Sequence, residues 1–381
     1  MLSALAAIPV ALGSAWITLG LFATLKATRQ RRLHEPVDPP PVSVLKPLCG
    51  AESGLEANLE SLFSQDYPRY ELVFGAVDAD DPALPIAERV AARHPDVPTR
   101  FVVHPGGPEL NPKVRNLRGM LPAAAHDLVV ISDSSIRAPA HYLRELVGVQ
   151  QGSGAGLVTN LFAIAEGETL GAALDSVQAA GFVASGVALP TLLGEAAVVG
   201  KSTLFSREEF SRLGGFERLA DVLAEDFVLG KMYQHARRKV AIAPTVVESV
   251  THELSLWGFV KRHLRWSMMR WRLEPLAAAL EPFARPLALA PFAITAFGPK
   301  LGVAWTVAAW AVRDVGGHLL LRGVRRAWVP IVLAPVSDLL MLGVWALAPI
   351  KQHVSWRGTR LRLGAGTLLY REAPAPKVEP S

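Results

Sequence analysis

The sequence predicts an α/β domain built on a mostly parallel sheet, with apolar helices before and after it. Short apolar runs alternate with polar, helix-like stretches from residue 42 to about residue 250, an uncharged apolar stretch precedes them, and apolar blocks return after residue 282. Of the 381 residues, 50% are hydrophobic and 19% are charged. This composition is more apolar than is usual for a water-soluble protein of this length, and it excludes a disordered chain.

The N-terminal stretch, residues 2–25, contains no charged side chain. As a helix it extends for about 36 Å, which is enough to cross a hydrocarbon core of about 30 Å. The basic residues that follow it are Lys26, Arg29, Arg31 and Arg32. Their position favours a retained anchor over a cleaved signal peptide and keeps the next domain in the cytoplasm. Because prolines between residues 35 and 41 end the helix, we predict a membrane anchor at 1–26 and a linker at 27–41.

The segment 42–282 is the predicted α/β domain. Its apolar runs at 42–45, 71–77, 99–103 and 128–131 are candidate strands. Buried strands that alternate with helices form parallel sheets, which bind ligands at the carboxyl ends of their strands. Polar side chains occur at three such ends: Lys46, then Asp78 with Asp80 and Asp81, then Asp133. We therefore expect a binding site at this edge of the sheet.

Apolar blocks make up the segment 283–352, and two or three membrane segments fit them. Basic residues flank the last block on both sides, so we expect one block to be re-entrant or interfacial. Asp314 and Asp338 interrupt the blocks, and they either pair with nearby arginines or line a path for a lipid. The final segment, 353–381, is basic and ends in a proline-rich tail that we expect to be disordered.

The net charge of +5 favours an anionic partner, such as nucleic acid, a phospholipid surface or the phosphates of a nucleotide. The arginines cluster beside the apolar blocks, and the sequence contains no zinc finger and no basic stripe with interspersed aromatic residues. These features favour lipid or nucleotide phosphates and exclude nucleic acid as the expected partner. The single cysteine, Cys49, excludes an internal disulfide and a cluster of cysteine metal ligands.

Two carboxylate positions are candidates for chemistry. Asp133 follows the apolar run 128–131 and precedes two serines, so it leaves a buried strand into a turn of small residues. It could hold a divalent cation against a diphosphate, or it could only cap a following helix. Glu225 and Asp226 form the second position, where a carboxylate could act as a base beside an acceptor hydroxyl, or both could be ordinary acids at a helix start.

Arg262, Arg265 and Trp266 are spaced so that they share one face of a helix. Two guanidinium groups beside an indole suit a departing nucleoside diphosphate, although an interfacial amphipathic helix would show the same pattern, and both interpretations can hold together. A different stretch, Gly194 with Gly200 to Ser202, resembles a phosphate-binding loop. Its glycines are too far apart, so we reject a kinase or ATPase function.

A series of short signatures runs through the chain: Val44 to Leu48 before Gly50; Asp66, Tyr67, Pro68; Asp78, Asp80, Asp81, Pro82; Asn111, Pro112, Lys113 with Asn116; Asp133, Ser134; Glu225, Asp226; Arg262, Arg265, Trp266; and Ser355, Trp356, Arg357 to Arg362. In this order and spacing they resemble the ceramide glucosyltransferases over nearly the whole chain. These are membrane-anchored, inverting glycosyltransferases with a GT-A-type, Rossmann-like catalytic fold, so the resemblance implies this fold for residues 42–282.

The resemblance also implies roles for individual residues. The acidic turn of Asp78, Asp80 and Asp81 would hold the nucleoside of a UDP-sugar, with Asp81 as the best single position. The donor would be bound further by Lys46, Lys113 and Asn116. Asp133 would reach the diphosphate through a divalent cation, Mg²⁺ or Mn²⁺, and Asp226 would be the general base. Arg262, Arg265 and Trp266 would grip the leaving nucleotide and border the acceptor channel.

Two departures from the family pattern concern the cation and the acceptor. No second aspartate follows Asp133, so a cation would need ligands from phosphates, water or another side chain. The stretch around Phe182, Ser185 and Gly186 lacks a histidine that the animal ceramide enzymes carry there. The chain also resembles a bacterial group associated with hopanoid lipids, which adds an N-acetylglucosamine-type sugar to a polyol.

The predicted function is the inverting transfer of glucose or N-acetylglucosamine from a UDP-sugar to a hydroxyl group of a membrane lipid. We expect an integral protein of a bacterial-type cytoplasmic membrane with its catalytic domain facing the cytoplasm. The acceptor is ceramide or, alternatively, a hopanoid polyol. A processive polysaccharide synthase would need more membrane segments than the blocks allow, and a scaffold without activity would not need all three carboxylate sites.

Overall fold

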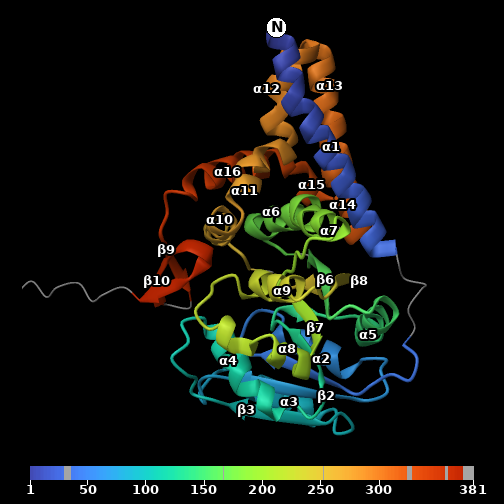
Figure 1. Ribbon diagram of the computed structural model, residues 1–381, viewed down its shortest axis with the longest axis vertical. Helices are drawn as coiled ribbons and strands as arrows, with labels where there is room; N and C mark the ends of the chain where they lie inside the picture. Colours follow the sequence, from blue (N-terminus) through green and yellow to red (C-terminus); the bar gives the residue numbers. More distant parts are fainter. Residues whose placement is uncertain (30–35, 166, 252, 324–327, 357–358, 372–381) are drawn as a thin grey trace, which may run out of the picture.

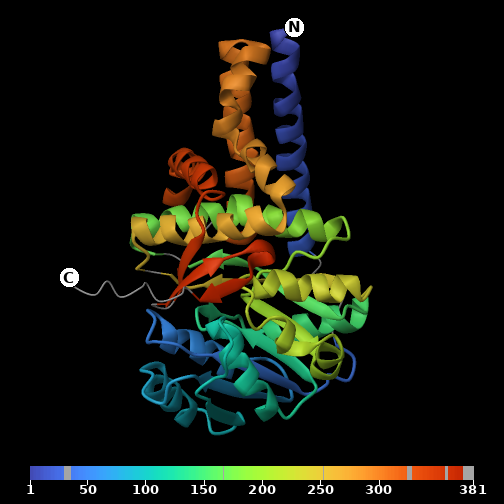
Figure 2. The ribbon, with the colours of Figure 1, turned by 60° about the vertical axis from the view of Figure 1, so that its left-hand side comes forward.

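The computed structural model describes residues 1–29, 36–165, 167–251, 253–323, 328–356 and 359–371. Residues 30–35 of the predicted linker, which include the basic residues Arg31 and Arg32, and the predicted disordered tail lie outside the described residues. The described chain has three parts: a sheet domain, a layer of helices against it, and a helical bundle that extends away from both (Figure 1, Figure 2).

The sheet domain is built on an eight-stranded sheet with strand order β3-β2-β1-β4-β7-β6-β8-β5. The strands are β1 (Val42–Pro47), β2 (Tyr70–Ala76), β3 (Thr99–Val103), β4 (Leu128–Ser132), β5 (Ile136–Arg137), β6 (Leu157–Ile164), β7 (Ser202–Ser206) and β8 (Val240–Ser249). Strands β1 to β4 pair in parallel, as do β6 and β8, whereas β7 runs antiparallel to β4 and β6, and β5 to β8. The predicted α/β fold and its four candidate strands are confirmed.

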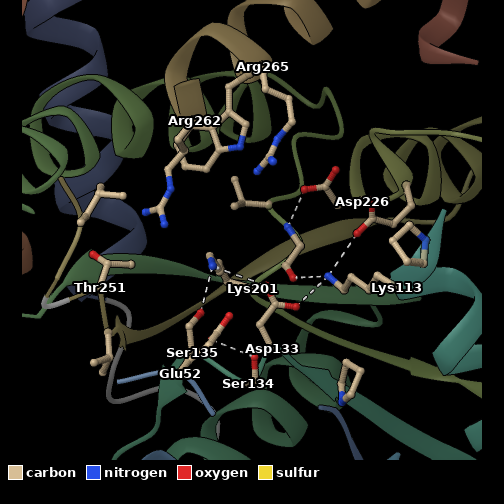
Figure 3. Close-up of a pocket in the computed structure, with 18 of the residues that line it drawn as sticks. Glu52, Lys113, Asp133, Ser134, Ser135, Lys201, Asp226, Thr251, Arg262 and Arg265 are labelled. Atoms are coloured by element: carbon tan, nitrogen blue, oxygen red, sulfur yellow. Dashed lines mark hydrogen bonds and ion pairs between the residues drawn. The ribbon is translucent and has the colours of Figure 1, made fainter. Parts of the chain in front are cut away.

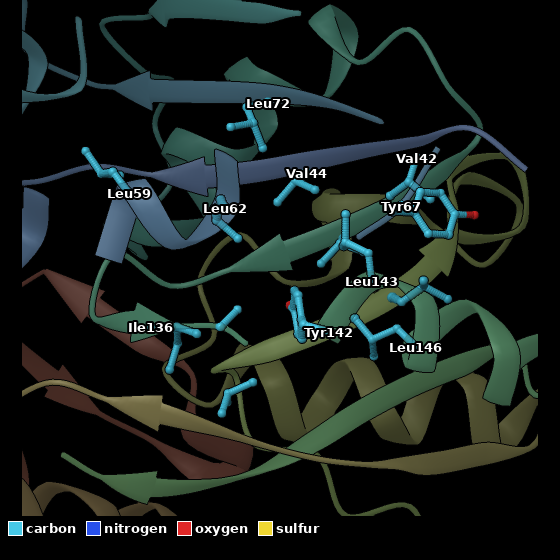
Figure 4. Packing of buried hydrophobic residues seen from close by; sticks show 14 of the residues in the cluster. Val42, Val44, Leu59, Leu62, Tyr67, Leu72, Ile136, Tyr142, Leu143 and Leu146 are labelled. Atoms are coloured by element: carbon cyan, nitrogen blue, oxygen red, sulfur yellow. The ribbon is translucent and has the colours of Figure 1, made fainter. Parts of the chain in front are cut away.

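Alternate residues of the central strands pack on opposite faces of the sheet, as the two-residue period of a strand requires. In β1, Val42 and Val44 join one apolar cluster and Leu45 joins another. The first face, part of which Figure 4 shows, is covered by α2 (Leu55–Phe63), α3 (Ala83–Ala92) and α5 (Tyr142–Ser153). The second is covered by α4 (Pro112–Met120), η1 (Leu121–Ala123), α8 (Arg207–Arg212), η3 (Gly215–Arg218) and α9 (Glu225–His235). Because both faces are occupied, the strand ends are left for ligand binding.

A layer of helices lies between the sheet domain and the bundle (Figure 1). It consists of α6 (Leu170–Gln178), a π-helical turn η2 (Ala179–Val183), α7 (Ala184–Leu192), α10 (Leu256–Leu273), α11 (Pro275–Leu280) and η4 (Glu281–Ala284). The elements α6, η2 and α7 continue into one another with helical backbone at each junction. This continuous helix of 23 residues is apolar enough to cross a membrane, but its most apolar part is 72% buried inside the protein.

The bundle consists of α1 (Leu2–Arg29), α12 (Pro286–Phe297) and α13 (Pro299–Trp310), with the N-terminus at its far end (Figure 1). Helix α1 is long and apolar enough to cross a membrane. Large apolar side chains are exposed along the bundle; they include Leu5, Leu12, Leu19, Phe22, Phe292, Leu301 and Val307. An exposed apolar surface of this extent is typical of contact with a membrane or a partner.

A buried charge network lies where the bundle meets the helical layer. The π-helical turn η5 (Ala311–Val315) and α14 (Gly316–Leu321) continue from α13, and α15 (Val329–Val332) and α16 (Ala334–Leu347) follow. The Arg313 guanidinium lies 2.9 Å from carboxylate oxygens of both Asp314 and Asp338, and Arg285 lies 3.3 Å from Asp338. Of the two expectations for these aspartates, the structure therefore shows the pairing with nearby arginines.

The C-terminal part forms a small antiparallel sheet of β9 (His353–Trp356), β10 (Thr359–Leu363) and β11 (Leu369–Arg371), with the turn η6 (Ala365–Thr367) before β11. This sheet holds the loop that precedes α9. The backbone N–H of Leu223 donates to the Thr367 carbonyl at 2.9 Å, and that of Leu369 donates to the Asp221 carbonyl at 2.7 Å. The start of α9, where Glu225 and Asp226 lie, is therefore fixed by residues far away in the sequence.

Candidate active site

A polar cavity of about 560 Å³ opens at the edge of the sheet where β1 and β4 end (Figure 3). Charged side chains of both signs line it: Glu52, Lys113, Asp133, Lys201, Glu225, Asp226, Glu253, Arg262 and Arg265. They come from loops after parallel strands, from the loop before the antiparallel strand β7, from the starts of α4 and α9, and from α10. The predicted site at this edge thus gathers Asp133, Asp226 and the arginines in one cavity.

Asp133 forms the floor of the polar cavity between two lysines. Its carboxylate lies 2.8 Å from the Lys113 ammonium and 3.4 Å from the Lys201 ammonium. Burial alone would raise the pKa of Asp133, but the two ammonium groups outweigh it and lower this pKa below its usual value. After Asp133 the chain enters the short strand β5 rather than a helix, so the structure does not show the helix-cap role.

Lys113 connects the carboxylates of the cavity. Its ammonium also lies 3.1 Å from Glu225 and donates to the Gly200 carbonyl at 2.7 Å. Burial favours the neutral amine, but Asp133 and Glu225 outweigh burial, so the pKa of Lys113 is raised. Lys113 is therefore a fixed positive charge at the centre of the site.

Asp226 lies in the first turn of α9. One carboxylate oxygen accepts from the Gly200 backbone N–H at 2.6 Å and the other from that of Phe227 at 2.8 Å. Burial, and after it the negative charge of neighbouring Glu225, raise the pKa of Asp226 to about 6. A carboxylate with such a pKa is a stronger base than an ordinary aspartate and is still deprotonated at neutral pH.

Arg262 and Arg265 lie on the face of α10 that closes the cavity opposite Asp133 (Figure 3), and Trp266 lines the same cavity. The predicted helical spacing is observed. Burial, together with the nearby positive charge of Arg262, lowers the pKa of Arg265. The two guanidinium groups thus form a positively charged wall across from the lysines.

A side cavity of about 260 Å³ shares Leu48, Pro112 and Asn116 with the polar cavity. Asp78 and Asp81 line it. The Asp81 carboxylate accepts from the backbone N–H of Gly50 at 2.9 Å and of Ala83 at 2.9 Å. Two of the three acidic-turn residues therefore border a space that continues from the polar cavity.

Two of the predicted donor-binding residues lie elsewhere. Within the part of the chain that the structure describes, neither Lys46 nor Asp80 lines these two cavities. The Lys46 side chain is fully buried, donates to the Ile136 carbonyl at 2.7 Å, and has its pKa lowered to about 7 by burial. Asp80 is exposed, and its backbone N–H donates to the Asp78 carboxylate.

An apolar cavity of about 470 Å³ adjoins the polar cavity. It is lined mainly by η2 and α7, by the loop 195–199, and by α9, α10 and α11, with Trp16 of the N-terminal helix. The two cavities share four lining residues: Val199, Asp226, Trp266 and Met269. Phe182 and Gly186, from the stretch where acceptor contacts are expected, line the apolar cavity. Asp226 is therefore accessible from a charged space and from an apolar one.

The side chains around Asp133 suit a cation that is bound together with phosphate oxygens of a ligand. Among the described residues, no group of three or more His, Cys, Asp or Glu side chains is placed to hold a metal ion. In phosphate sites Mg²⁺ is commonly held by one or two carboxylates together with phosphate oxygens and water. Asp133 can be such a carboxylate, so the donor set suits a cation bound jointly with a diphosphate.

Lys201 is a site residue that the sequence interpretation missed. The antiparallel register pairs Ser132 of β4 with Ser202 of β7, so the next pair outward is Asp133 and Lys201. The ammonium of Lys201 also donates to the Ser135 hydroxyl at 3.1 Å. The available signal was a lysine directly before the short segment Ser202–Ser206, but it fell within the rejected phosphate-loop pattern. In the structure this stretch leads into a strand.

Comparisons of the sequence identify relatives. The sequence pattern of Glycosyl transferase family 21 matches residues 5–369. Ceramide glucosyltransferase 1 of Caenorhabditis elegans is 27% identical over 256 residues, which are 66% of this chain and 55% of that protein. Ceramide glucosyltransferase of Komagataella phaffii is 30% identical over 115 residues, which are 29% of this chain and 23% of that protein. The chain spans about half the length of the curated Caenorhabditis elegans relatives that it matches.

The fold is also similar to a solved structure, mannosyltransferase PcManGT from Pyrobaculum calidifontis in complex with GDP-Man and Mn²⁺. The TM-score is 0.53 at 20% sequence identity, and the match covers 92% of this chain and 99% of that one. At this identity the similarity shows the fold alone. It confirms the GT-A-type fold that the sequence resemblance implied.

Proposed function

The chain belongs to glycosyl transferase family 21, and we propose that it transfers a hexose from a UDP-sugar to a hydroxyl group of a membrane lipid of the ceramide type, with inversion at the anomeric carbon. The observation that carries this proposal is the contact between the polar and the apolar cavity at Asp226. A charged space suits a sugar nucleotide and an apolar one suits a lipid chain. The residue between them is the one that would take the proton of the acceptor.

The donor would lie along the polar cavity, with its nucleoside toward Asp78 and Asp81 in the side cavity. Its diphosphate would lie among the cations Lys113, Lys201, Arg262 and Arg265. Phosphate oxygens are strong acceptors for ammonium and guanidinium donors. A divalent cation held through Asp133 would add positive charge to the same diphosphate.

The transfer would be a single displacement. Asp226 takes the proton of the acceptor hydroxyl while that oxygen forms a bond to the anomeric carbon. The bond between this carbon and the diphosphate oxygen breaks on the opposite face, and its electron pair leaves with the nucleotide. Arg262 and Arg265 stabilise the charge that develops there, because they are already fixed at the cavity wall before the reaction. One displacement gives inversion.

The acceptor would enter from the bilayer. The bundle of α1, α12 and α13 has exposed apolar side chains, and Trp16 of α1 lines the apolar cavity. Helix α16 has 14 residues, which is about 21 Å and too short to cross the hydrocarbon core alone, so it suits the expected interfacial block. The basic residues Lys26 and Arg29 end α1 beside the sheet domain, which supports an active site on the cytoplasmic side.

The test is product analysis with defined substrates. Purified protein in detergent is incubated with UDP-glucose or UDP-N-acetylglucosamine and with ceramide or a hopanoid polyol, and lipid products are identified by mass spectrometry. Hexosylceramide, absent with Asp226→Asn, supports the proposal. N-acetylhexosamine on the polyol would show that the acceptor is the hopanoid polyol and the sugar is N-acetylglucosamine. Products with many sugar units would indicate a processive synthase. No transfer from either donor to either lipid would contradict the proposal.

A further inference from the structure

Asp175 is a buried carboxylate to which neither the family signatures nor the proposed mechanism gives a role. It lies on α6 with 1% of its surface exposed. One oxygen accepts from the Arg262 guanidinium at 2.6 Å, and the other accepts from the Nε2–H of His263 at 2.8 Å. An unpaired carboxylate is costly at such a depth, so this double pairing with two neighbouring residues of α10 is a specific arrangement.

We propose that Asp175 is a positioning residue that holds the guanidinium of Arg262 in place for the diphosphate of the nucleotide. This inference rests on the proposed function, because it takes the polar cavity as the site of a nucleoside diphosphate. Asp175 itself does not line that cavity, whereas Arg262 does. Asp175 therefore acts through Arg262.

The charges in the cavity explain why Arg262 needs such a partner. The positive charges of Lys201 and Arg265 act against that of Arg262. The same cavity also contains five carboxylates, but the one that is paired with the Arg262 guanidinium is Asp175, behind the cavity. With 25% of its side chain exposed, Arg262 could otherwise turn into solvent, away from this repulsion. A carboxylate on its buried side opposes that movement and leaves its remaining N–H groups directed at the cavity.

His263 fixes the carboxylate in turn. Its side chain is 3% exposed and its ring lies 4.4 Å from the ring of Phe259 and 5.1 Å from that of Trp266, measured between centroids. The imidazole cannot move without repacking these rings, so the second oxygen of Asp175 has a rigid donor. A group held in this way places its partner to within a fraction of an ångström, which is what a preorganised site requires.

The test is a double-mutant cycle on the binding of UDP, measured by calorimetry on full-length protein in detergent with Mg²⁺. Arg262→Gln removes the charge but leaves a donor for Asp175, and we expect it to weaken UDP binding by about tenfold or more. Asp175→Asn keeps the shape of the side chain and should weaken UDP binding by a comparable factor. The double variant should bind UDP as Arg262→Gln alone does, because Asp175 acts only through Arg262.

Glu71→Gln is the matched control. Glu71 is 3% exposed, accepts from Ser43 and Arg100, and lies in β2 away from the cavities. The Glu71→Gln variant should have a lower melting temperature than the wild type and the same affinity for UDP. If Asp175→Asn does not fold, Asp175→Glu takes its place in the cycle, because this variant keeps the negative charge but changes its position.

The outcomes separate the two proposals. Wild-type protein that binds neither UDP nor a UDP-sugar would contradict the proposed donor. Two results would contradict the positioning role while the proposed function stands, provided that the wild type binds UDP. One is that Asp175→Asn alone leaves the affinity for UDP unchanged. The other is that Asp175→Asn weakens UDP binding further when it is added to Arg262→Gln. Equal losses in both single variants and the double variant would support the positioning role.

Discussion

The ammonium of Lys201 lies 3.4 Å from the carboxylate of Asp133, and the two residues are brought together by the antiparallel register of β7 against β4. Asp133 ends a parallel strand and Lys201 precedes an antiparallel one, so both occupy the same edge of the sheet. An aspartate at this edge can hold a cation, and the lysine beside it adds a positive charge that belongs to the protein. The site therefore contains positive charges of its own beside Asp133.

The first prediction concerns Lys201. Lys201→Met keeps the length of the side chain and removes the charge, so it should lower kcat by roughly tenfold or more, because a charge-assisted contact to the leaving diphosphate is lost. Lys239→Met, at an exposed position near β8, is the control and should leave kcat unchanged. Equal rates for the two variants would show that Lys201 does not contact the diphosphate.

The second prediction concerns the proposed general base. Asp226→Asn should lower transfer by at least about 100-fold and retain UDP-sugar binding, because it removes the base and leaves the cations. Rates are measured with a radiolabelled donor and binding by calorimetry. Asp127→Asn, at an exposed turn that binds the start of α8, is the control. Turnover retained in Asp226→Asn would refute the assignment.

The same substitution should change how the stability of the fold depends on pH. Burial raises the pKa of Asp226 from 3.8 to about 6, so between these values the folded protein binds more protons than the unfolded chain. The contribution of Asp226 to the free energy of unfolding therefore decreases as the pH rises through this interval and is least favourable above it. The melting temperature of the wild type relative to that of Asp226→Asn should therefore decrease as the pH rises through this interval. A difference between the two proteins that does not change with pH would contradict the raised pKa.

The third prediction is a pH dependence of activity. Asp226 acts as a base only when deprotonated, so kcat/KM should fall about tenfold per pH unit below its pKa of about 6. The negative charge of Glu225 contributes to raising this pKa, after burial. Glu225→Gln should therefore shift the acid limb of the profile to lower pH. If the acid limb of Glu225→Gln lies at the same pH as that of the wild type, the limb reports the titration of a group other than Asp226.

The fourth prediction concerns the divalent cation. If Asp133 shares a cation with the diphosphate, Mg²⁺ should strengthen UDP binding to the wild type, and EDTA should reverse this effect. Asp133→Ala should weaken UDP binding and remove its response to Mg²⁺. Calorimetric titrations with and without Mg²⁺ measure both effects. A variant with unchanged affinity and an unchanged response would exclude Asp133 as the ligand.

The fifth prediction tests the apolar cavity as the acceptor site. Gly186 lines this cavity, and a side chain added there would meet open space. Gly186→Phe should fill the cavity and raise the KM for the lipid about tenfold or more, since it removes apolar contact area from the acceptor, while UDP affinity stays unchanged. Gly343→Phe, at an exposed and equally open position on α16, is the control. An unchanged KM would place the acceptor elsewhere.

The strands β1, β2 and β4 could be predicted because each is a short apolar run that is buried on both faces of a sheet. The edge strand β3 is largely exposed and could be predicted from its β-branched and aromatic residues alone. Asp133 and Asp226 could be singled out because a carboxylate at the end of an apolar run or the start of a helix is visible in the sequence. Their common cavity could not be derived from local patterns, because it depends on how α9 and α10 pack over the sheet edge.

Other parts of the site depend on long-range contacts that leave no local signal. Lys201 faces Asp133 only through the register of an antiparallel strand, and Asp175 meets Arg262 only because α6 packs against α10. Lys46 shows the opposite case. Its position at a strand end predicts contact with a bound ligand, but its buried side chain donates a hydrogen bond to the Ile136 carbonyl instead.

The hydrogen bonds of Thr367 and Leu369 to the loop before α9 have a consequence for biosynthesis. A ribosome makes Asp226 long before it makes these two residues, and all apolar helices between residues 283 and 352 are made in the interval. The loop that leads to Asp226 therefore receives these two backbone hydrogen bonds only after the helices α12 to α16 have been synthesised. A growing chain can complete this wall of the polar cavity only when its last strands have been made.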